Sequence, residues 1–576
     1  MKTIRIPRGV YCCLAFLLAC LISGSPLPAQ SPSLTERLSP NTVFFLVWNG
    51  HASYAGSEQK NHLLQLLHDP AFASMWTAAT NKVQQGTPNG AGAAGASLAP
   101  DIISALDNPF VFGVVIDPDA PKTAAPGVST SPFAAFGIYD ETGKADVVEK
   151  LEAQSRAGSK TTVEVTKYDF SGASIEVRTA GKQVSYRAHA GNYYLMADRK
   201  QVIEDLVTRF RSADRPATSI AQSAEYDRMH KYVGADAALE IFGRIPDSST
   251  WNLPEKNAKQ IMQLAKSLHL EKIHVMAGAL NFEGEATRFR GAVLGDTSPT
   301  GLFDVAGASG ATFQTQPVIA TAPVFSITHM NLAALYQLIR DAVNDSAPSG
   351  SNPNLAMVEA GAQNFLGMSI TDALSLFPGE IASASFYSAD GVPEQLYAAT
   401  IEKPDAVLRV LRALVGTMIS NEDTSGSATY LDLAYPYTDP ATGAKRRRFY
   451  YVAVTPKVIV AAPRKAMLRE ALQRLDAGAA DPPATGVLAD PQYAQLRSRL
   501  PEKLSGLTGA SISGIPLDSI LKNIESQAAP AANPSNGQKP PDLSWLRLDV
   551  ISRYLHITLS GWWKDSNGVY FDSYIQ

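Results

Sequence analysis

Two stretches of this chain, YYLMADRKQVIEDLVTRF (residues 193–210) and VIVAAPRKAMLREALQRL (residues 458–475), have the same pattern of a short strand followed by a helix. Four residues of the first stretch recur 265 positions later: Ala197, Arg199, Lys200 and Arg209 correspond to Ala462, Arg464, Lys465 and Arg474. A self-match at one long offset indicates an internal duplication.

Further matches lie on both sides of this pair and keep the same order along the chain. KADVVEKL from Lys144 matches KPDAVLRV from Lys403, and residues 216–218 (PAT) match residues 483–485. Near the two ends, residues 273–275 (IHV) match residues 555–557 (LHI). The offset changes slowly, from 259 to 282 positions, as expected for one duplicated unit whose loops differ in length.

Each half predicts strands that alternate with single helices. Residues 173–191 and residues 429–456 are alternating runs around turn residues, so each predicts a β-hairpin, with turns at 179–182 and 439–443. A strand and then a helix follow each hairpin, and each half closes on another strand pair. This order predicts an α+β fold in two duplicated halves, each a largely antiparallel sheet with helices packed on it.

Local signals predict where individual helices begin. Leucine spacing over residues 62–75 predicts a helix, and within it Asp69-Pro70 has the form of an N-cap followed by Pro at the first helical position. Asp490-Pro491 repeats this form before QYAQLRSRL. Asp198 and Gln201 have the spacing of a capping box at the start of the helix after residue 198.

The first thirty residues have the layout of a secretory signal peptide. Lys2, Arg5 and Arg8 form a basic region, residues 10–22 are almost continuously apolar, and SGSPLPAQ follows. The apolar run is shorter than the ~18–20 residues that span a bilayer, so we expect cleavage near residue 29 or 30 and export to the periplasm or the medium. The alternative is a lipoprotein signal, LLAC, in which Cys20 becomes the acylated first residue and anchors the chain.

Composition narrows the expected partners further. All three cysteines, Cys12, Cys13 and Cys20, lie in the signal segment, so the mature chain is predicted to have no disulfide. Removing its three basic residues from the 50 in the chain leaves 47 against 54 acidic residues, a net charge of −7. A mildly acidic chain is a poor nucleic-acid binder, and no later stretch is apolar enough for a transmembrane helix.

The expected domain organisation follows from the duplication and the signal segment. A signal peptide occupies residues 1–30, and the first α+β repeat occupies residues 31–297. A Gly-, Ser- and Thr-rich linker occupies residues 298–315, and the second α+β repeat occupies residues 316–576.

The search for catalytic motifs gives no site. The nine histidines form neither HxH nor HExxH, and GxSxG and GxxxxGK[ST] are missing from the sequence. Ser57-Glu58-Gln59-Lys60 satisfies SxxK but lacks the SDN and KTG elements that accompany it in serine enzymes. His274 and His556 fall on matched positions, where a hydrogen bond at the edge of the core is the favoured role. We therefore predict no catalytic residue, no cofactor and no metal.

Two sets of cations are candidates for binding. The repeated pairs fall at expected helix starts, where free backbone N–H groups favour anions; these candidate anion contacts are Arg199, Lys200, Arg464 and Lys465. Residues 445–448 (KRRR) lie near an expected hairpin tip, where a solvated tip and contact with an anionic envelope lipid or polysaccharide are the two interpretations.

The opening of the mature chain carries a family resemblance. LSPNTVFFLVWNG from Leu38 and the following LLHDPAF resemble a group of uncharacterised bacterial secreted and envelope proteins. Those proteins open on an "LPADT" phrase and have duplicated α+β halves after a signal peptide. In this chain Ser39 and Pro40 shift the proline by one position. The resemblance implies an envelope protein without an assigned activity and carries over no catalytic residue.

Two classes of function remain open from the sequence. The first is an exported, non-catalytic protein that binds or scaffolds an envelope protein, lipid or polysaccharide, since a duplicated unit offers a pseudo-symmetric surface. The alternative is an envelope hydrolase whose site is assembled from distant residues. A pocket with convergent polar groups and perturbed titratable residues would favour the hydrolase.

Overall fold

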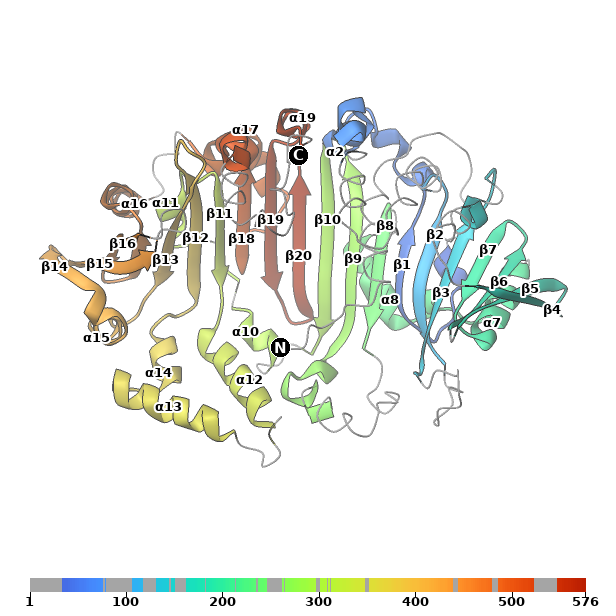
Figure 1. Cartoon of the computed structure of the whole chain (residues 1–576), viewed down its shortest axis with the longest axis horizontal. Helices are drawn as coiled ribbons and strands as arrows, with labels where there is room; N and C mark the ends of the chain where they lie inside the picture. Colours follow the sequence, from blue (N-terminus) through green and yellow to red (C-terminus); the bar gives the residue numbers. More distant parts are fainter. Residues whose placement is uncertain are drawn as a thin grey trace. The chain divides into compact units, whose positions relative to one another are not determined.

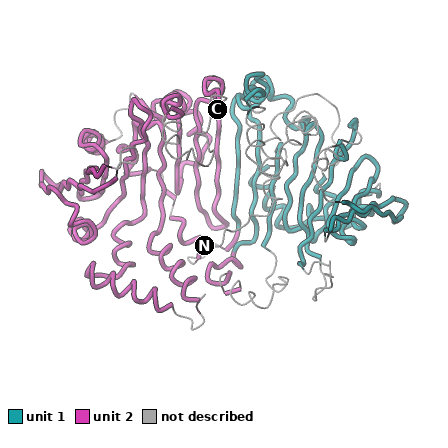
Figure 2. Tube along the Cα trace, viewed as in Figure 1, with its two compact units in different colours: residues 1–255, 273–294, 576 teal, residues 256–272, 295–575 magenta. Residues whose placement is uncertain are grey.

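The structure is a computed structural model of the whole chain (Figure 1). It describes residues 34–75, 78, 106–117, 131–144, 147–150, 162–181, 183–212, 214–234, 237–245, 262–263, 265–296, 301–307, 309–310, 312–345, 347, 352–438, 444–478, 485–522 and 546–576. The chain forms two compact units (Figure 2). Unit 1 comprises residues 1–255, 273–294 and 576, and unit 2 comprises residues 256–272 and 295–575.

Unit 1 is built on an antiparallel sheet. Its strands are β1 (Thr42–Trp48), β2 (Phe110–Ile116), β3 (Phe133–Asp140), β4 (Glu164–Phe170), β5 (Ala173–Ala180), β6 (Gln183–Ala190), β7 (Tyr193–Ala197), β8 (Leu239–Arg244), β9 (Ile273–Glu283) and β10 (Ala286–Gly295). Pairing gives the order β4-β5-β6-β7-β3-β2-β1-β8-β9-β10. Its helices are η1 (Leu34–Arg37), η2 (His51–Ser53), η3 (Ala55–Ser57), α2 (His62–His68), α7 (Lys200–Arg211), η4 (Ile220–Gln222) and α8 (Ala224–Val233).

Unit 2 is also built on an antiparallel sheet. Its strands are β11 (Val324–His329), β12 (Glu380–Tyr387), β13 (Pro393–Thr400), β14 (Ile419–Ser425), β15 (Ala428–Thr438), β16 (Lys445–Val454), β17 (Val458–Ala462), β18 (Gly506–Ser511), β19 (Ile557–Lys564) and β20 (Gly568–Ile575). Pairing gives the order β14-β15-β16-β17-β13-β12-β11-β18-β19-β20. The predicted α+β class with largely antiparallel sheets is confirmed.

The helices of unit 2 include a long pair between β11 and β12. This pair is α12 (Leu332–Asp345) and α13 (Pro353–Leu366). The other helices of the unit are η6 (Leu270–Lys272), α10 (Leu302–Val305), α11 (Gln316–Ile319), α14 (Ile370–Ser375), α15 (Pro404–Val415), η7 (Gly416–Met418), α16 (Lys465–Ala477), η9 (Val487–Ala489), α17 (Pro491–Arg497), η10 (Ile512–Gly514) and α19 (Leu548–Tyr554). Residues 298–315, where the sequence predicts a linker, contain α10 and two bridging positions, Ala306 with Met330 and Gly310 with Leu504.

Helix α7 shows how the apolar pattern places a helix on its sheet. Val202, Ile203, Leu206, Val207 and Phe210 recur at helical spacing, and all five are buried. The helix packs against β6 and β7. Because each fully buried side chain of this type contributes ~1.5–3 kcal/mol, this face is enough to hold the helix against the sheet.

Each unit has its own apolar core. In unit 1 the core includes Trp48, Leu106 and Tyr194, and the indole N–H of Trp48 donates to the carbonyl oxygen of Leu106 at 2.6 Å. In unit 2 a core cluster joins Val407 and Val410 of α15 to strand residues that include Leu431 and Val452.

The local predictions have mixed outcomes. Both hairpins form as β5–β6 and β15–β16, although the predicted turn at 439–443 lies outside the described residues. Asp490 caps α17 as predicted, because its side chain accepts from the Gln492 N–H. The single helix over 62–75 is wrong, because α2 ends at His68 and Asp69 is extended (φ −68°, ψ 124°). The predicted N-cap is confirmed, since residues 70–75 are again helical and the Asp69 carboxylate accepts from the Ala71 N–H at 2.7 Å.

The capping box predicted for Asp198 and Gln201 is also wrong. The N-cap of α7 is Arg199, which makes no side-chain capping bond. The Asp198 carboxylate instead accepts from the Ala135 N–H at 3.1 Å, a contact with β3 that lies 63 positions away in the sequence. The Asp198 side chain therefore forms a hydrogen bond with a distant strand, whereas the local spacing had predicted that it would cap the helix.

Candidate functional site

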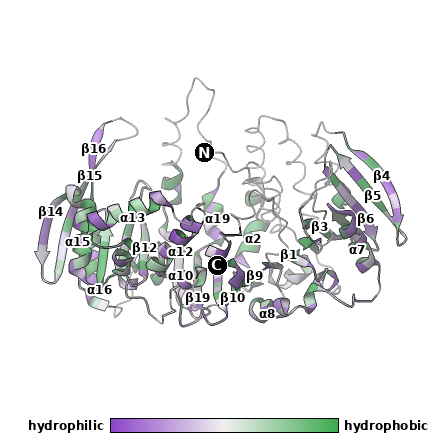
Figure 3. Cartoon of the chain, turned by 90° about the horizontal axis from the view of Figure 1, so that it is seen from below, coloured by the Kyte–Doolittle hydropathy of each residue, from purple (hydrophilic) through white to green (hydrophobic). Residues whose placement is uncertain are grey.

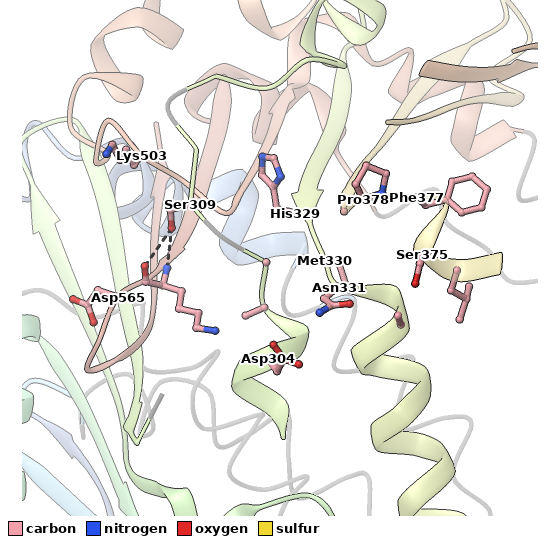
Figure 4. A pocket seen from close by; sticks show the side chains of 16 residues that line it. Asp304, Ser309, His329, Met330, Asn331, Ser375, Phe377, Pro378, Lys503 and Asp565 are labelled. Atoms are coloured by element: carbon pink, nitrogen blue, oxygen red, sulfur yellow. Dashed lines mark hydrogen bonds between the residues drawn. The ribbon is translucent and has the colours of Figure 1, made fainter. Parts of the chain in front are cut away.

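The candidate site is a cavity of about 910 Å³ in unit 2 (Figure 4). It lies where β11 ends, against the loop after α10, the end of α14 and the β19–β20 turn. Its polar wall is formed by Asp304, Ser309, His329, Asn331, Ser375, Lys503, Lys564 and Asp565, and its apolar wall by Ala306, Met330, Ala333, Leu374, Phe377 and Pro378.

The strand register explains why His329 reaches this wall. His329 is the last residue of β11, and alternation puts it on the same face as the buried Phe325 and Ile327. Its backbone N–H donates to the Ser505 carbonyl oxygen at 2.6 Å, so the strand end is tied to the segment that leads into β18. The imidazole is therefore fixed at the boundary between the core and the cavity.

Glu380 lies directly opposite His329 across the β11–β12 pair. It is only 3% exposed, and both of its oxygens accept hydrogen bonds at the start of α11. The donors are the Gln314 N–H at 2.9 Å, the Thr315 N–H at 2.5 Å and the Thr315 hydroxyl at 2.5 Å. These donors satisfy the hydrogen-bonding capacity of the buried Glu380 carboxylate without the imidazole. Nε2 of His329 lies 4.0 Å from Oε2 of Glu380.

The imidazole of His329 has a lowered pKa and a ring nitrogen whose hydrogen-bonding capacity is unused among the described residues. Burial lowers the pKa of His329 below its ordinary value, and the nearby Glu380 carboxylate opposes this shift without reversing it. The ring stacks on Phe313, with centroids 5.2 Å apart. Within the described part of the chain, Nε2 is buried and has no hydrogen-bond partner. A neutral imidazole nitrogen of this kind can accept or donate one bond to a ligand.

Ser309 lies on the same wall, but its hydroxyl is committed elsewhere. Its Oγ lies 2.8 Å from the Ser505 Oγ, accepts from the Lys564 N–H at 3.1 Å and contacts the Lys564 carbonyl oxygen at 3.3 Å. Figure 4 shows these last two bonds as dashed lines, with His329 on a different strand of the wall. A nucleophilic serine needs its base within hydrogen-bond reach, whereas the hydrogen bonds of Ser309 are made to Ser505 and to the Lys564 backbone.

A close backbone approach shapes this side of the cavity. The Gly307 N–H donates to the His329 carbonyl oxygen at 3.0 Å. A Cβ at position 307 would lie 2.6 Å from the carbonyl carbon and oxygen of His329, so only glycine fits there. The loop after α10 thus passes directly over the end of β11.

The charged groups of the wall differ in how they are used. The Lys564 ammonium donates to the Phe303 carbonyl oxygen, and the Asp565 carboxylate accepts from the Asn567 N–H at 2.7 Å. Asp304 and Lys503 have no ion-pair partner among the described residues. One carboxylate and one ammonium therefore remain available to a bound molecule.

The four cations singled out in the sequence are all near carboxylates. Arg199 lies 3.5 Å from Asp117 and donates to the Ser131 carbonyl oxygen at 2.6 Å, and Lys200 lies 3.7 Å from Glu204. An anion bound by these two residues would compete with those contacts.

The matching pair in unit 2 is engaged in the same way. Arg464 lies 2.6 Å from Glu394, and Lys465 lies 2.7 Å from Asp432. Arg464 also lines a second, smaller cavity of about 120 Å³. An anion contact at the four positions stays a prediction, and the described structure brings none of them to the large cavity.

The other residues considered from sequence lie away from the cavity. The Ser57 hydroxyl donates to the Phe282 carbonyl oxygen at 2.8 Å. His274 is exposed on β9, and His556 directly precedes β19. Among the described residues, no group of three or more His, Cys, Asp or Glu is placed to hold a metal ion. None of the described helices has both the length and the apolar character needed to cross a membrane.

Sequence reasoning missed the residues that do form the cavity. His329 is the last residue of β11, and its neighbour Glu380 is the first residue of β12; a titratable side chain at the end of a strand that is otherwise partly buried is the signal that marks them. The β11–β12 register places His329 opposite Glu380. The bridge between Gly310 and Leu504 positions the loop that carries Ser309. Both are long-range features that no local motif encodes.

Comparison with known proteins gives one match. A family model described as "Protein of unknown function (DUF3352)" matches residues 79–401, more than half of the chain. The match runs through most of unit 1 and into unit 2 as far as β13. Comparison with curated proteins gives no match, and comparison with solved structures gives none either. On the extent of the family match, the chain belongs to the DUF3352 family of proteins of unknown function.

Proposed function

We propose that this protein is exported and acts in the bacterial envelope as a non-catalytic binding protein that holds a small ligand in the cavity of unit 2. The support for export is the signal layout of residues 1–30. The observation that carries the binding role is the cavity itself. It combines a carboxylate and an ammonium that have no ion-pair partner among the described residues with an imidazole and an apolar wall.

The cavity's chemistry indicates the class of ligand. At about 910 Å³ it lies within the size range of small-molecule sites. Asp304 suits a cationic group, Lys503 suits an anionic group, and Nε2 of His329 suits a hydroxyl or amide. Met330, Leu374 and Phe377 supply apolar contact. A small zwitterion with an apolar portion, such as an amino acid or a short peptide, satisfies all of these groups.

A binding panel tests the proposal. Purified protein is titrated by calorimetry with apolar amino acids, dipeptides, neutral sugars and simple anions. We expect a zwitterion to bind the wild type, and Lys503→Met to weaken that binding about tenfold or more, because a hydrogen bond to a charged group contributes ~1.5–3 kcal/mol. The matched control is Lys457→Met, an exposed lysine that does not line the cavity. No binding across the panel, or equal effects of the two substitutions, contradicts the proposed ligand class.

A hydrolase is the second candidate, because Ser309 and His329 line the same cavity. Catalysis would require the Ser309 hydroxyl to leave Ser505 and the Lys564 backbone and to reach the imidazole. Assays on envelope-type esters and peptides with wild type and Ser309→Ala decide between the two. Turnover that Ser309→Ala abolishes would replace the binding proposal by the enzyme.

We also infer that the chain arose by internal duplication. The support is the strand order of the two units. Adding ten to the number of every strand in the order of unit 1 gives the order of unit 2. The two helices that follow β7 and β17 are capped alike, by Arg199 (φ −133°, ψ 143°) and Arg464 (φ −132°, ψ 137°). These two residues are also matched in sequence.

Export has a direct test of its own. Mass spectrometry of the protein isolated from its source gives the mature N-terminus. A terminus near residue 30 supports signal peptide cleavage, and an acylated Cys20 supports a lipoprotein anchored to the envelope. An intact Met1 on the functional protein would overturn the export proposal.

A further inference from the structure

The outer part of the β15–β16 hairpin extends beyond both neighbouring strands. β14 pairs with β15 only as far as Leu433, and β17 pairs with β16 only from Tyr451 onward. Residues 434–438 and 445–449, hereafter the basic ribbon, pair only with each other among the described strands. At ~3.4 Å per residue, five residues of ribbon reach roughly 17 Å past the rest of the sheet. Figure 3 shows the outer part of β16 as hydrophilic.

The basic ribbon carries a concentrated positive charge. Residues 445–448 (KRRR) are all exposed, and neither 434–438 nor 444–450 contains an acidic residue. Within the described residues, Lys445 and Arg447 have no ion-pair partner. The Arg448 guanidinium lies over the Tyr437 ring, 4.2 Å from its centroid, and not against a carboxylate. The fold therefore leaves this charge directed at solvent.

Aromatic residues accompany the cations on both faces of the ribbon. Strand alternation puts Arg448 and its cross-strand neighbour Tyr435 on one face and Arg447 and Phe449 on the other. Phe449 is 43% exposed, a large apolar side chain at the base of the cationic run. A two-stranded ribbon with cations and aromatics on both faces is suited to a partner that surrounds it, because one rigid surface could cover only one face.

The hairpin at the same place in the strand order of unit 1 lacks these features. β4 pairs with β5 as far as Thr179, and the hairpin closes at Ala180 and Gln183, so almost no ribbon extends past its neighbour. Arg178 forms an ion pair with Glu176, and this contact contributes to lowering the pKa of the Glu176 carboxyl. The projecting run of four cations is thus a feature of unit 2 that the hairpin fold itself does not require.

We propose that the basic ribbon binds the headgroup layer of a bilayer containing anionic phospholipids. Lys and Arg near an anionic leaflet gain electrostatic attraction, and Tyr and Phe are favoured at the depth of the headgroups. A headgroup layer surrounds an inserted ribbon, so both of its faces find partners. The ribbon would then orient unit 2 at the membrane surface independently of any ligand in the cavity.

Vesicle co-sedimentation of the purified full chain tests this inference. The probes are vesicles of phosphatidylcholine alone and of phosphatidylcholine with phosphatidylglycerol. We expect binding to the mixed vesicles that exceeds binding to the neutral ones and falls with added salt. Replacing all four cations by Gln should weaken partitioning at least about 100-fold, since each cation near an anionic surface contributes severalfold. This test variant is Lys445→Gln, Arg446→Gln, Arg447→Gln and Arg448→Gln.

Three further variants make the result specific. A matched control removes four exposed cations outside the ribbon and should bind as the wild type does: Arg409→Gln, Lys457→Gln, Arg469→Gln and Lys522→Gln. A charge-preserving variant, Arg446→Lys, Arg447→Lys and Arg448→Lys, should keep most of the binding. Phe449→Ser should weaken vesicle binding severalfold, and because the ribbon lies outside the core, circular dichroism should show each variant folded.

Two outcomes would overturn the inference. Equal vesicle binding by the wild type and the four-Gln ribbon variant would exclude the ribbon as the contact. Binding to soluble dextran sulfate without binding to anionic vesicles would identify a polysaccharide site in place of a lipid surface, and Phe449→Ser would then leave binding unchanged.

Discussion

At the scale of single residues, His329 is unusual because it is a titratable side chain on the buried face of β11. The strand places it on the buried face, and yet its Nε2 has no partner among the described residues. A buried nitrogen without a hydrogen bond destabilises the fold by ~1–3 kcal/mol.

The lowered pKa of His329 predicts a pH dependence of stability. Because the folded pKa lies below the unfolded value of about 6.5, the unfolded chain binds the proton more readily between these two values. The stability contribution is therefore complete above about pH 6.5 and is lost as pH falls through the folded pKa. Calorimetric Tm values at pH 7.5 and 5.0 should fall more for wild type than for His329→Gln.

The exposed His274 provides the control for that experiment. His274→Gln should reproduce the wild-type fall in Tm, because the side chain lies in solvent on β9. A larger fall in His329→Gln than in wild type would mean that folding raises the pKa of His329, which contradicts the structure.

At the scale of helices and strands, local chemistry was predictable wherever the cause was itself local. Asp490 precedes Pro491 and caps the helix it was expected to cap. Asp198 has a comparable signal, but its carboxylate bonds to β3, and no spacing along α7 could indicate that contact. The hairpins were predictable from alternation, whereas the positions of β1 and β11 between distant strands were not.

Capping gives a prediction at this scale. Asp490→Ala removes the bond from the Gln492 N–H and the contact with the Ser511 hydroxyl, and should lower stability by ~1 kcal/mol. For a unit of this size that corresponds to roughly 2–4 °C in Tm. Asp490→Asn should keep most of the cap.

A second aspartate separates capping from the general effect of losing a charge. Asp476→Ala, at an exposed position near the end of α16, should change Tm by less than Asp490→Ala does. If the two alanine variants lose equal stability, the cap is not what Asp490 contributes.

At the scale of the whole molecule, the two units have strand orders that correspond one to one, and the inferred duplication predicts more than order. In an experimental structure, superposing β7 and α7 on β17 and α16 should place Arg199 on Arg464. Placement of Arg199 far from Arg464 in that superposition would refute the inference.

The limits of sequence reasoning at this scale come from contacts between distant residues. The described residues between 262 and 272 precede the boundary expected between the halves, but they belong to unit 2. The Ser267 hydroxyl lies 2.5 Å from Asp345, and the Asp296 N–H donates to the Lys272 carbonyl oxygen at 2.9 Å. The cavity wall likewise includes Asp304, Ala306, Gly307 and Ser309 from the range expected to be a linker. The Gly-, Ser- and Thr-rich composition indicated a linker there. Composition carries no information about contacts between residues that are far apart in the sequence.

The position of β1 in its sheet constrains how the chain can fold as it is made. Phe44 pairs with Gly243, and Trp48 pairs with Leu239. One edge of this central strand therefore has no pairing partner until almost 200 further residues have been synthesised. At ~5–20 residues per second, that wait lasts roughly 10–40 s. During this time β1 presents an open, apolar edge, and β11 faces the same delay until β18 is made. Because non-local pairs form slowly, we expect these longest-range strand pairs to limit the folding rate of each unit.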